Sequence, residues 1–367
     1  MSAPIRILLV DDSAVIRRLL TGVLSGDPAL EVADSAANGR IALAKLLAVK
    51  PDIVILDVEM PEMDGLETLA EIRKRQPRLP VIMFSSITER GAAVTLEALA
   101  LGANDYVTKP SNSGNMTTAL QRVREELIPR IKTFCRLRSP PTPAPAPLNR
   151  PIAPQPQPQP QPRPGPLPVA PRQRQRVDVV AIGISTGGPN ALAALLPQLP
   201  ANFPAPILIV QHMPPIFTRL LAERLAAQSL LSIAEGVEGG ILRPGQVWLA
   251  PGGLHMALER QGTQVRLRLN QNPPENSCRP AVDVLFRSVA EVYRANALAV
   301  VMTGMGNDGL KGCEAIRRAG GQILAQDESS SVVWGMPGFV AKAGLADGQI
   351  ALPQLAGEIL TRVRTAR

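Results

Sequence analysis

A proline- and glutamine-rich tract from Ser139 to Arg176, with PQPQPQPQPRPGP near its centre, divides the chain into two parts. Such a segment lacks the apolar side chains that would offset the entropy lost on ordering, and it favours extended polyproline II conformation. We therefore expect a semi-rigid spacer, and a proline-rich ligand for a partner domain is a second interpretation. The chain of 367 residues is long enough for two domains. We expect folded domains at 1–130 and 177–367, with a linker at 131–176.

Short aliphatic runs alternate with helix-like stretches on both sides of this linker. The expected strands before the linker are IRILLV, DIVILD, PVIMFS and NDYVTK. Those after it are VDVVAIG, PILIVQ, GQVWLAP, ALAVVMTG and GGQILAQ. Strands that alternate with helices predict a parallel sheet covered by helices on both faces. The predicted class is therefore α/β, with one doubly wound domain on either side of the linker.

Composition and charge exclude several classes of protein. Hydrophobic residues make up 45% and charged residues 19%, as in ordinary globular proteins, and no apolar run reaches the roughly 18 to 20 residues of a membrane span. Without a signal-peptide core at the amino terminus, we expect a cytoplasmic protein with no membrane insertion. The net charge of +8 is partly concentrated in the linker, and we find neither zinc-finger spacing nor a helix-turn-helix. Nucleic acid is therefore not an expected partner. The three cysteines, Cys135, Cys278 and Cys313, form no CxxC pair and fit free thiols, so a metal role for them is not expected.

Polar residues follow the expected strands of the first domain. Five of them stand at strand ends, namely Asp11, Asp12, Asp57, Ser85 and Lys109. In open parallel sheets such groups gather at the carboxyl edge. Three carboxylates repel one another unless a hard cation such as Mg²⁺ joins them, and an aspartate held against Mg²⁺ can attack a phosphoryl donor. The alternative is that each acid only caps the helix that follows its strand, as Asp12 could.

The motifs LLVDDS, LDVEMPEMDG, FSS and DYVTKP resemble the receiver domain of two-component response regulators, over about residues 6–127. The resemblance implies a flavodoxin-like fold, a histidine kinase as phosphodonor and an output domain. It also implies a role for each of these residues: Asp57 as phospho-acceptor, Asp11, Asp12 and Asp57 as Mg²⁺ ligands, Ser85 as the switch hydroxyl, Lys109 as the phosphate contact, and Tyr106 as a rotameric switch.

The second domain begins with AIGISTGGPN, which places Ser185 in a G-x-S-x-G pattern between Gly183 and Gly187. This spacing is that of a nucleophile elbow, in which glycines permit a tight strand-to-helix turn. Amides at the start of the following helix can then face an oxyanion. The alternative is a glycine-rich turn that simply starts a helix. A phosphate-binding loop is not indicated, because GxxxxGK[ST] and GxGxxG are both missing from this stretch.

A serine nucleophile needs a base, usually histidine, and an acid that fixes the tautomer of that base. His212 directly follows the strand PILIVQ, whereas His255 lies a few residues beyond GQVWLAP, so position favours His212. The acid candidate is Asp308 in TGMGNDG, just after ALAVVM. Alternatively, His212 is a polar strand terminus and Asp308 caps the helix that begins near Leu310. The order serine, histidine, aspartate differs from that of the α/β-hydrolases, so an ordinary member of that group is not expected.

The motifs AIGISTGGP, QHMP, APGGLHM, RPAVDVLF and TGMGNDG, behind a receiver and a linker, resemble the chemotaxis protein-glutamate methylesterases, which are also glutamine deamidases. The match covers about residues 177–352 and implies a Rossmann-like, doubly wound parallel-sheet hydrolase domain. The site residues that the resemblance implies are Ser185 as nucleophile, His212 as general base and acid, Asp308 as orienting acid, Thr186 beside the nucleophile, Met305 as oxyanion-hole amide, and His255 as a second histidine in the cleft.

The function implied is a phosphorylation-regulated serine hydrolase that removes methyl groups from glutamate methyl esters of chemoreceptors and deamidates glutamines. Mg²⁺ is expected in the receiver and no cofactor in the esterase site. We also expect the unphosphorylated receiver to pack over the catalytic cleft, and phosphorylation of Asp57 to shift the population toward an open arrangement. The alternative is a non-catalytic, phosphorylation-controlled adaptor of a two-component pathway.

Overall fold

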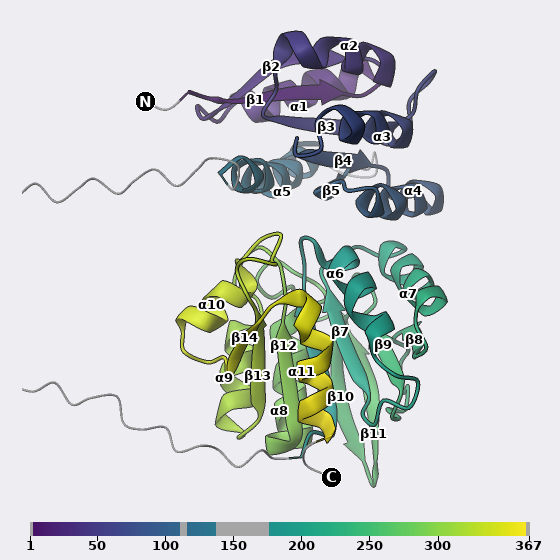
Figure 1. The fold of residues 1–367 in the computed structure, drawn as a ribbon, viewed down its shortest axis with the longest axis vertical. Coiled ribbons are helices and arrows are strands. Elements are labelled where there is room, and N and C mark those ends of the chain that lie inside the picture. The colour runs from purple at the N-terminus through teal and green to yellow at the C-terminus, as the bar shows by residue number, and fades with distance from the viewer. Residues whose placement is uncertain (1–2, 111–115, 137–175, 365–367) are drawn as a thin grey trace, which may run out of the picture.

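The structure is a computed structural model that describes residues 3–110, 116–136 and 176–364. Two α/β domains stack one on the other, the N-terminal domain above the C-terminal domain in Figure 1. The last helix of the first domain runs to Arg136 and so continues six residues past the predicted boundary at 130. Most of the predicted linker lies outside the described residues. Within the described ranges, no helix is both long and apolar enough to span a membrane.

The N-terminal domain is a parallel sheet in the order β2-β1-β3-β4-β5, with α1 and α5 on one face and α2, α3 and α4 on the other. The central strands are buried aliphatic runs, which is why the sequence predicts them. Strand β2 is not predicted, because only its first and last residues are buried. The bounds are β1 (Ile5–Val10), α1 (Ala14–Ser25), β2 (Leu30–Ala36), α2 (Gly39–Val49), β3 (Ile53–Asp57), α3 (Gly65–Arg75), β4 (Val81–Ser85), α4 (Glu89–Ala100), β5 (Asp105–Thr108) and α5 (Met116–Arg136).

The C-terminal domain is a seven-stranded sheet in the order β14-β13-β12-β6-β7-β9-β8, and all neighbouring strands are parallel. Helices α6, α7 and α11 cover one face, and α8, α9 and α10 cover the other. The bounds are β6 (Val179–Ile184), α6 (Gly188–Leu195), η1 (Leu196–Gln198), β7 (Ile207–Gln211), α7 (Phe217–Gln228), β8 (Ser232–Glu235), β9 (Gln246–Leu249), β10 (His255–Gln261), β11 (Gln264–Asn270), α8 (Val282–Tyr293), η2 (Arg294–Asn296), β12 (Ala297–Val301), α9 (Leu310–Arg318), β13 (Gln322–Gln326), α10 (Met336–Lys342), β14 (Gly348–Ile350) and α11 (Leu352–Arg364).

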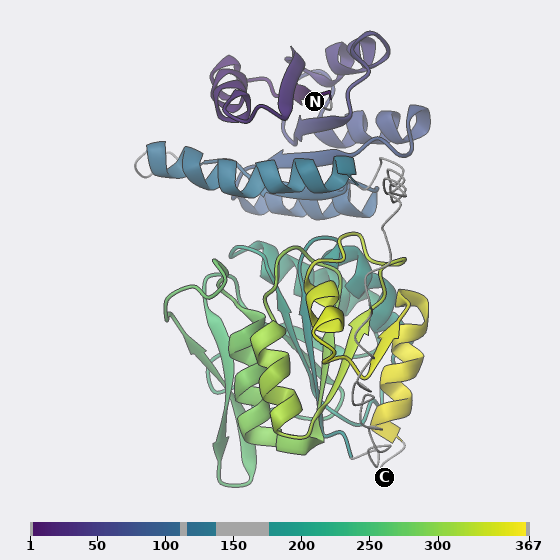
Figure 2. The same ribbon diagram turned by 90° about the vertical axis from the view of Figure 1, so that its left-hand side faces the viewer.

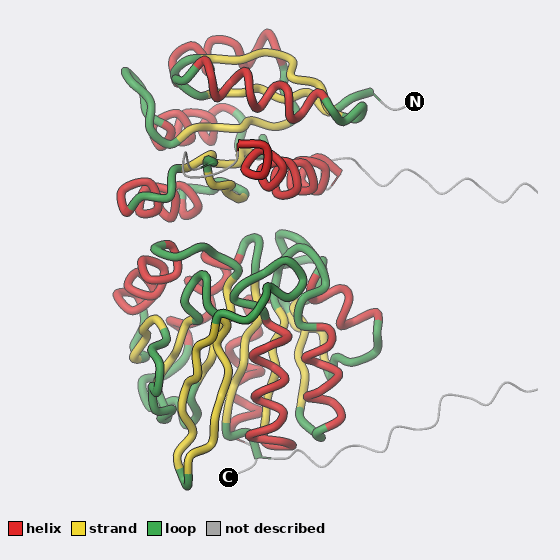
Figure 3. The backbone as a smooth tube through the Cα atoms, turned by 180° about the vertical axis from the view of Figure 1, so that it is seen from behind, coloured by secondary structure: helices red, strands yellow, loops and turns green. Residues whose placement is uncertain are grey.

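An antiparallel hairpin of β10 and β11 stands apart from the main sheet, and Figure 3 shows it extending past the sheet's end. A prediction from continuous aliphatic runs does not find the hairpin, whose strands alternate between core and solvent as half-buried strands do. Met256, Leu258 and Leu267 face the core beneath α8. The hairpin thereby leads the chain back to the start of α8, where the loop 271–281 reaches the candidate active site.

The sheet order explains where the site forms. The chain passes from β6 outward to β7, β8 and β9, and it later returns to the other side of β6 with β12. A crevice opens at such a reversal, beyond the carboxyl ends of the strands. Ser185 follows β6, His212 follows β7, and Asp308 lies in the loop after β12. The three predicted triad residues therefore share one edge of the sheet.

The receiver covers this same edge. Figure 2 shows α4 and α5 lying across the loops at the carboxyl end of the seven-stranded sheet. Helix α4 contacts both α6 and α7. One hydrophobic cluster is continuous between the domains, with Leu96 and Tyr106 of the receiver and Phe217 of the C-terminal domain among its members. The two domains are thus packed together through apolar side chains.

Candidate active site and phosphoacceptor site

The acid cluster of the receiver forms as the sequence predicts. Carboxylate oxygens of Asp11, Asp12 and Asp57 all lie within 4.8 Å of one another. Lys109 Nζ lies 2.9 Å from Asp11 Oδ2 and 2.7 Å from Asp57 Oδ2, and those two buried oxygens have no other partner in the described part of the chain. Helix α1 is capped by Ser13, so Asp12 is not used for capping. A set of carboxylates with one lysine has the donor chemistry and excess negative charge that suit Mg²⁺.

Burial makes Asp57 sensitive to its charged neighbours. Desolvation raises the pKa of Asp57 to about 6, the Lys109 ammonium lowers it in part, and the Asp11 carboxylate raises it further. Desolvation acts to lower the pKa of Lys109, but hydrogen bonds to Asp57 and Asp11 outweigh burial and raise it. The lysine therefore remains charged beside a carboxyl group that a cation would help to ionise.

The two predicted switch residues, Ser85 and Tyr106, both contact groups outside the acid cluster. Ser85 Oγ donates to the carbonyl of Gly91 in the first turn of α4, at 3.1 Å. Tyr106 is buried, and its ring stacks on Phe217 of the other domain with centroids 4.8 Å apart and planes inclined by 7°. Ser85 is thus bonded to α4 and Tyr106 is held at the domain interface.

The predicted elbow around Ser185 is formed by the end of β6 and the start of α6. Gly187 has φ of +80°, which only glycine adopts without strain, and it caps α6. The Ser185 amide donates to the Thr303 carbonyl at 3.0 Å, and Gln211 Nε2 donates to the Ser185 carbonyl, also at 3.0 Å. Strand ends on both sides therefore fix the backbone of Ser185.

Backbone amides are available beside this serine. Gly304 comes so close that a Cβ on it would lie 2.8 Å from Ser185 Cβ, so glycine here lets the following residue, Met305, reach the site. Across the described residues, the amides of Met305 and Thr186 donate no hydrogen bond. Unpaired amides next to a nucleophile are suited to stabilise an oxyanion. The predicted role of Met305 fits this placement.

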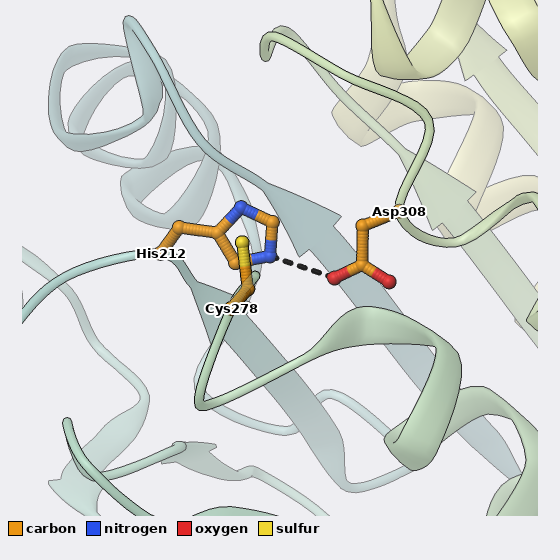
Figure 4. A group of neighbouring side chains, drawn as sticks. All are labelled: His212, Cys278 and Asp308. Carbon is orange, nitrogen blue, oxygen red and sulfur yellow. Dashed lines mark hydrogen bonds and ion pairs between the residues drawn. The ribbon is translucent and has the colours of Figure 1, made fainter. Parts of the chain in front are cut away.

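His212 and Asp308 are in direct contact. His212 Nε2 lies 2.8 Å from Asp308 Oδ2 (Figure 4). Burial acts to lower the pKa of His212, but its hydrogen bonds to Asp308 and Cys278 outweigh burial and raise it. Burial acts to raise the pKa of Asp308, but the hydrogen bonds from His212 and from two backbone amides lower it below the usual value. Asp308 is therefore a carboxylate, and among the described residues no hydrogen bond joins Ser185 Oγ to His212.

Asp308 is held by the amino terminus of α8. Its Oδ2 accepts from the Val282 amide at 2.7 Å, and its Oδ1 accepts from the Asp283 amide at 3.0 Å. The positive end of the helix dipole favours a carboxylate there. The sequence leaves capping of the helix near Leu310 as an alternative role, but Gly309 caps that helix without a side-chain bond.

Residues that sequence reasoning missed complete the surroundings of Asp308. Asn276 Nδ2 donates to Asp308 Oδ1 at 2.8 Å and to Asp283 Oδ2 at 3.0 Å, so it bridges two acids. Burial raises the pKa of Asp283. The motif RPAVDVLF contains Asp283, but nothing in its spacing shows that the residue faces Asp308. Asn276 lies in an irregular loop that periodicity does not reveal.

His255 departs from its expected place in the cleft. It is fully buried, its Nε2 donates to the carbonyl of Pro273 at 3.1 Å, and its Nδ1 accepts from the Ala281 amide at 3.2 Å. Both nitrogens are therefore occupied. The side chain fixes the two ends of the loop that carries Asn276 and does not line an open surface.

Polar contacts join the receiver to residues beside the predicted nucleophile. Thr186 Oγ1 donates to Asp105 Oδ2 at 3.0 Å, and the same oxygen accepts from Arg130 Nε at 2.9 Å. Asn190 Nδ2 donates to the Leu99 carbonyl at 2.7 Å. The receiver therefore bonds to the residue that directly follows the serine of the elbow.

Apolar side chains reinforce this contact on the other side of the site. Met305 and Val333 of the C-terminal domain pack into a hydrophobic cluster of the receiver, to which Phe84 and Val107 also belong. Met305 is the residue whose amide is predicted to face the oxyanion. The receiver therefore also packs against the loop that carries this amide.

The fold and the site together define a class. A receiver domain with a buried acid cluster is packed on a parallel-sheet domain whose sheet edge carries serine, histidine and aspartate, which is the design of a response regulator with an enzymatic output. Family models agree: the response regulator receiver domain matches residues 7–121, and CheB methylesterase matches residues 180–359. The chain belongs to the CheB methylesterase family.

Relatives match over nearly the full length. The chain is 52% identical over 98% of its length to a protein-glutamate methylesterase/protein-glutamine glutaminase of Trichodesmium erythraeum, with 99% of that protein covered. It is 48% identical over 99% of its length to a protein of the same name from Nocardioides, with 96% covered. The crystal structure of the Thermotoga maritima CheB methylesterase catalytic domain matches with 42% identity and a TM-score of 0.50, covering 50% of this chain and 97% of that one. The predicted family, the fold class and the assignment as a methylesterase-type enzyme are confirmed.

Proposed function

We propose that Ser185, His212 and Asp308 hydrolyse glutamate methyl esters on chemoreceptors, and that the same residues deamidate glutamines. The single observation that carries this proposal is the convergence of the three residues at one sheet edge, with His212 bonded to a carboxylate and free amides beside Ser185. Ester and amide substrates present the same carbonyl and differ in whether methanol or ammonia leaves.

The hydrogen bond to Asp308 indicates which imidazole nitrogen of His212 carries the proton and which is free to act as a base. A carboxylate can only accept, so Nε2 of His212 carries the proton that points to Asp308, and Nδ1 is left as the basic nitrogen. Ser185 Oγ attacks the ester carbonyl while Nδ1 takes its proton, and the amide of Met305 stabilises the oxyanion. Nδ1 then returns the proton to the departing methoxide. Water hydrolyses the acyl-enzyme by the reverse sequence of proton transfers.

Control by the receiver follows from the packing. The contacts from Asp105 to Thr186 and from Tyr106 to Phe217 hold the receiver over the residues beside Ser185 and restrict a receptor's approach. Phosphorylation of Asp57 offers Ser85 a phosphoryl oxygen in place of the Gly91 carbonyl. Movement of Ser85 and α4 then disfavours the covered arrangement, so the open population grows.

Asp11, Asp12 and Asp57 would hold Mg²⁺, whose charge would neutralise the acid cluster during phosphoryl transfer. Lys109 remains charged beside Asp57 and contacts the phosphoryl oxygens. A histidine kinase supplies the phosphoryl group, and the enzyme acts in the cytoplasm on the receptors' cytoplasmic segments. In the proposed esterase reaction the protein contributes side chains and backbone amides, and water is the second substrate.

The test is methanol release from a methylated receptor by the full chain, with Mg²⁺ and a small phosphodonor. Ser185→Ala should abolish release, and Ser277→Ala, an exposed serine in a neighbouring loop, should not. The phosphodonor should accelerate release by the wild type but not by Asp57→Asn. A folded wild-type chain that releases no methanol from any methylated receptor would instead favour the non-catalytic adaptor.

A further inference from the structure

Cys278 has no part in the proposed reaction, yet it lies beside the residues that carry it. The sulfur of Cys278, a ring nitrogen of His212 and a carboxylate oxygen of Asp308 all lie within 4.8 Å of one another. Figure 4 shows these side chains converging from three separate parts of the chain. Cys278 is half-buried and 12% of the His212 side chain is exposed, so a small ion can reach the group from solvent.

The three donors suit a borderline-soft cation. Zn²⁺ favours thiolate, imidazole and carboxylate ligands in tetrahedral geometry, whereas Mg²⁺ favours oxygen ligands alone. Donor atoms on a tetrahedral zinc lie about 3.3 to 3.7 Å apart, so the three atoms are within roughly 1.5 Å of the separations required. Three protein ligands leave a fourth position for water.

The loop that carries Cys278 is held in place by several contacts. Backbone hydrogen bonds of 3.1 and 2.8 Å join Glu275 to Cys278 in both directions. Arg287 Nη2 on α8 pairs with Glu275 Oε1 at 2.6 Å. His255 bonds to both ends of the loop. The position of the thiol is therefore fixed by the fold before any ion binds.

We propose that His212, Cys278 and Asp308 form an inhibitory site for Zn²⁺. The ion takes the place of the proton between His212 Nε2 and Asp308 Oδ2, and Oδ2 keeps its bond from the Val282 amide. The Cys278 thiol releases its proton to solvent and binds as thiolate. The displaced imidazole proton moves to Nδ1 through water, so binding to neutral imidazole releases one proton overall.

Zn²⁺ binding prevents His212 from acting as the base, because the ion occupies the one basic lone pair of the neutral imidazole. A neutral imidazole that is bound to metal through Nε2 carries its proton on Nδ1, so neither nitrogen can accept a proton from Ser185. Zinc binding itself does not depend on the reaction mechanism. The inhibitory consequence rests on the proposed function, because it requires His212 to be the base.

Binding is tested on the tag-free full chain with Mg²⁺ in excess, which keeps the acid cluster of the receiver occupied. Zn²⁺ affinity is measured by competition with a chelating dye, and Co²⁺ is added separately to look for thiolate-to-metal charge-transfer absorption. Cys278→Ser should weaken Zn²⁺ binding at least tenfold and remove the Co²⁺ band. The control variant is Cys135→Ser, which replaces a thiol in α5 by a hydroxyl donor. It should change neither the Zn²⁺ affinity nor the Co²⁺ band. Equal affinity and an equal band in Cys278→Ser would overturn the site.

Inhibition is tested by methanol release with a small phosphodonor over the same Zn²⁺ range. Zn²⁺ should inhibit the wild type and Cys135→Ser with the midpoint found in the binding assay, and a chelator should restore activity. Cys278→Ser should need at least tenfold more Zn²⁺. Cys278-dependent binding that leaves methanol release unchanged would overturn the inhibitory role and would contradict His212 as base. If the metal-free wild type releases no methanol, the proposed function fails. This outcome is distinct from a failure of the zinc site, which the binding assay reports.

Discussion

Thr186 and Asp105 are 81 residues apart in the chain, and a 3.0 Å hydrogen bond joins them across the domain interface. Thr186 directly follows the proposed nucleophile, and Asp105 begins the last strand of the receiver sheet. Arg130 bonds to the same carboxylate oxygen and fixes its position. A contact between the regulatory and catalytic domains is thus made one residue from Ser185.

Removing this contact should activate the unphosphorylated enzyme. Asp105→Ala deletes the acceptor of Thr186, and a buried hydrogen bond contributes about 1 to 2 kcal/mol, so the open population and basal methanol release should rise roughly 5- to 30-fold. Asn190→Ala, which removes a contact from an exposed side chain, should raise the basal rate more modestly. The measurement is methanol release without phosphodonor. Asp34→Ala breaks an ion pair with Lys45 and is the control; basal rates that match this control in both interface variants would contradict the packing model.

Asp308→Asn should leave the fold intact and strongly lower the rate of ester hydrolysis. The amide can still accept from the amino terminus of α8, but it no longer provides the negative charge that orients and stabilises the His212 imidazolium. We expect kcat to fall by roughly 10²- to 10⁴-fold with little change in KM. Circular dichroism checks folding, and steady-state methanol release gives both constants. A wild-type kcat in this variant would remove Asp308 from the mechanism.

Asn276→Ala should affect the reaction through the two acids that Asn276 bridges. Without its donor, Asp308 and Asp283 face each other with less compensation, so the pKa of Asp308 should rise and its support of His212 should weaken. We expect kcat to fall roughly tenfold, with the acidic limb of the pH–rate profile displaced. Asn272→Ala in the same loop is the matched control. Identical profiles for the two variants would show that the bridge is only structural.

Asp57→Asn should stabilise the Mg²⁺-free receiver at neutral pH. Between the ordinary value of 3.8 and about 6, folded Asp57 holds a proton that the unfolded chain has released, so this group makes stability fall as pH rises through that window. The variant should gain up to about 3 kcal/mol at pH 7 and nothing below about pH 4. Thermal unfolding at both pH values measures the difference. Adding Mg²⁺ should stabilise the wild type more than the variant, and a gain that is independent of pH would refute the assignment.

Much of the fold could be predicted from the sequence, because buried parallel strands are continuous aliphatic runs. A prediction from continuous aliphatic runs misses β2, most of whose residues are only partly buried, and the β10–β11 hairpin, whose apolar residues alternate with polar ones. The receiver helix α5 passes position 130, since its amphipathic pattern does not stop where the motif resemblance does. Strand ends located the proposed triad because parallel sheets gather their carboxyl ends at one edge.

Supporting side chains could not be predicted, because their roles depend on contacts between distant loops. Asn276 meets Asp308 only after the hairpin has returned the chain to α8. Gln211 differs from an ordinary polar strand terminus only through its bond to the Ser185 carbonyl. His255 has the residue type of a catalytic base, and only its full burial and two occupied nitrogens show otherwise.

Strand β5 spans four residues, and each end has a different neighbour. Asp105 at its start bonds to Thr186, and Lys109 just beyond its end bonds to Asp57. At about 3.3 Å per residue, roughly 13 Å of extended backbone separates these two positions. A structural change at Asp57 therefore has one short strand to cross before it reaches the neighbour of the proposed nucleophile, and that strand carries Tyr106, which packs in the hydrophobic cluster shared by the two domains.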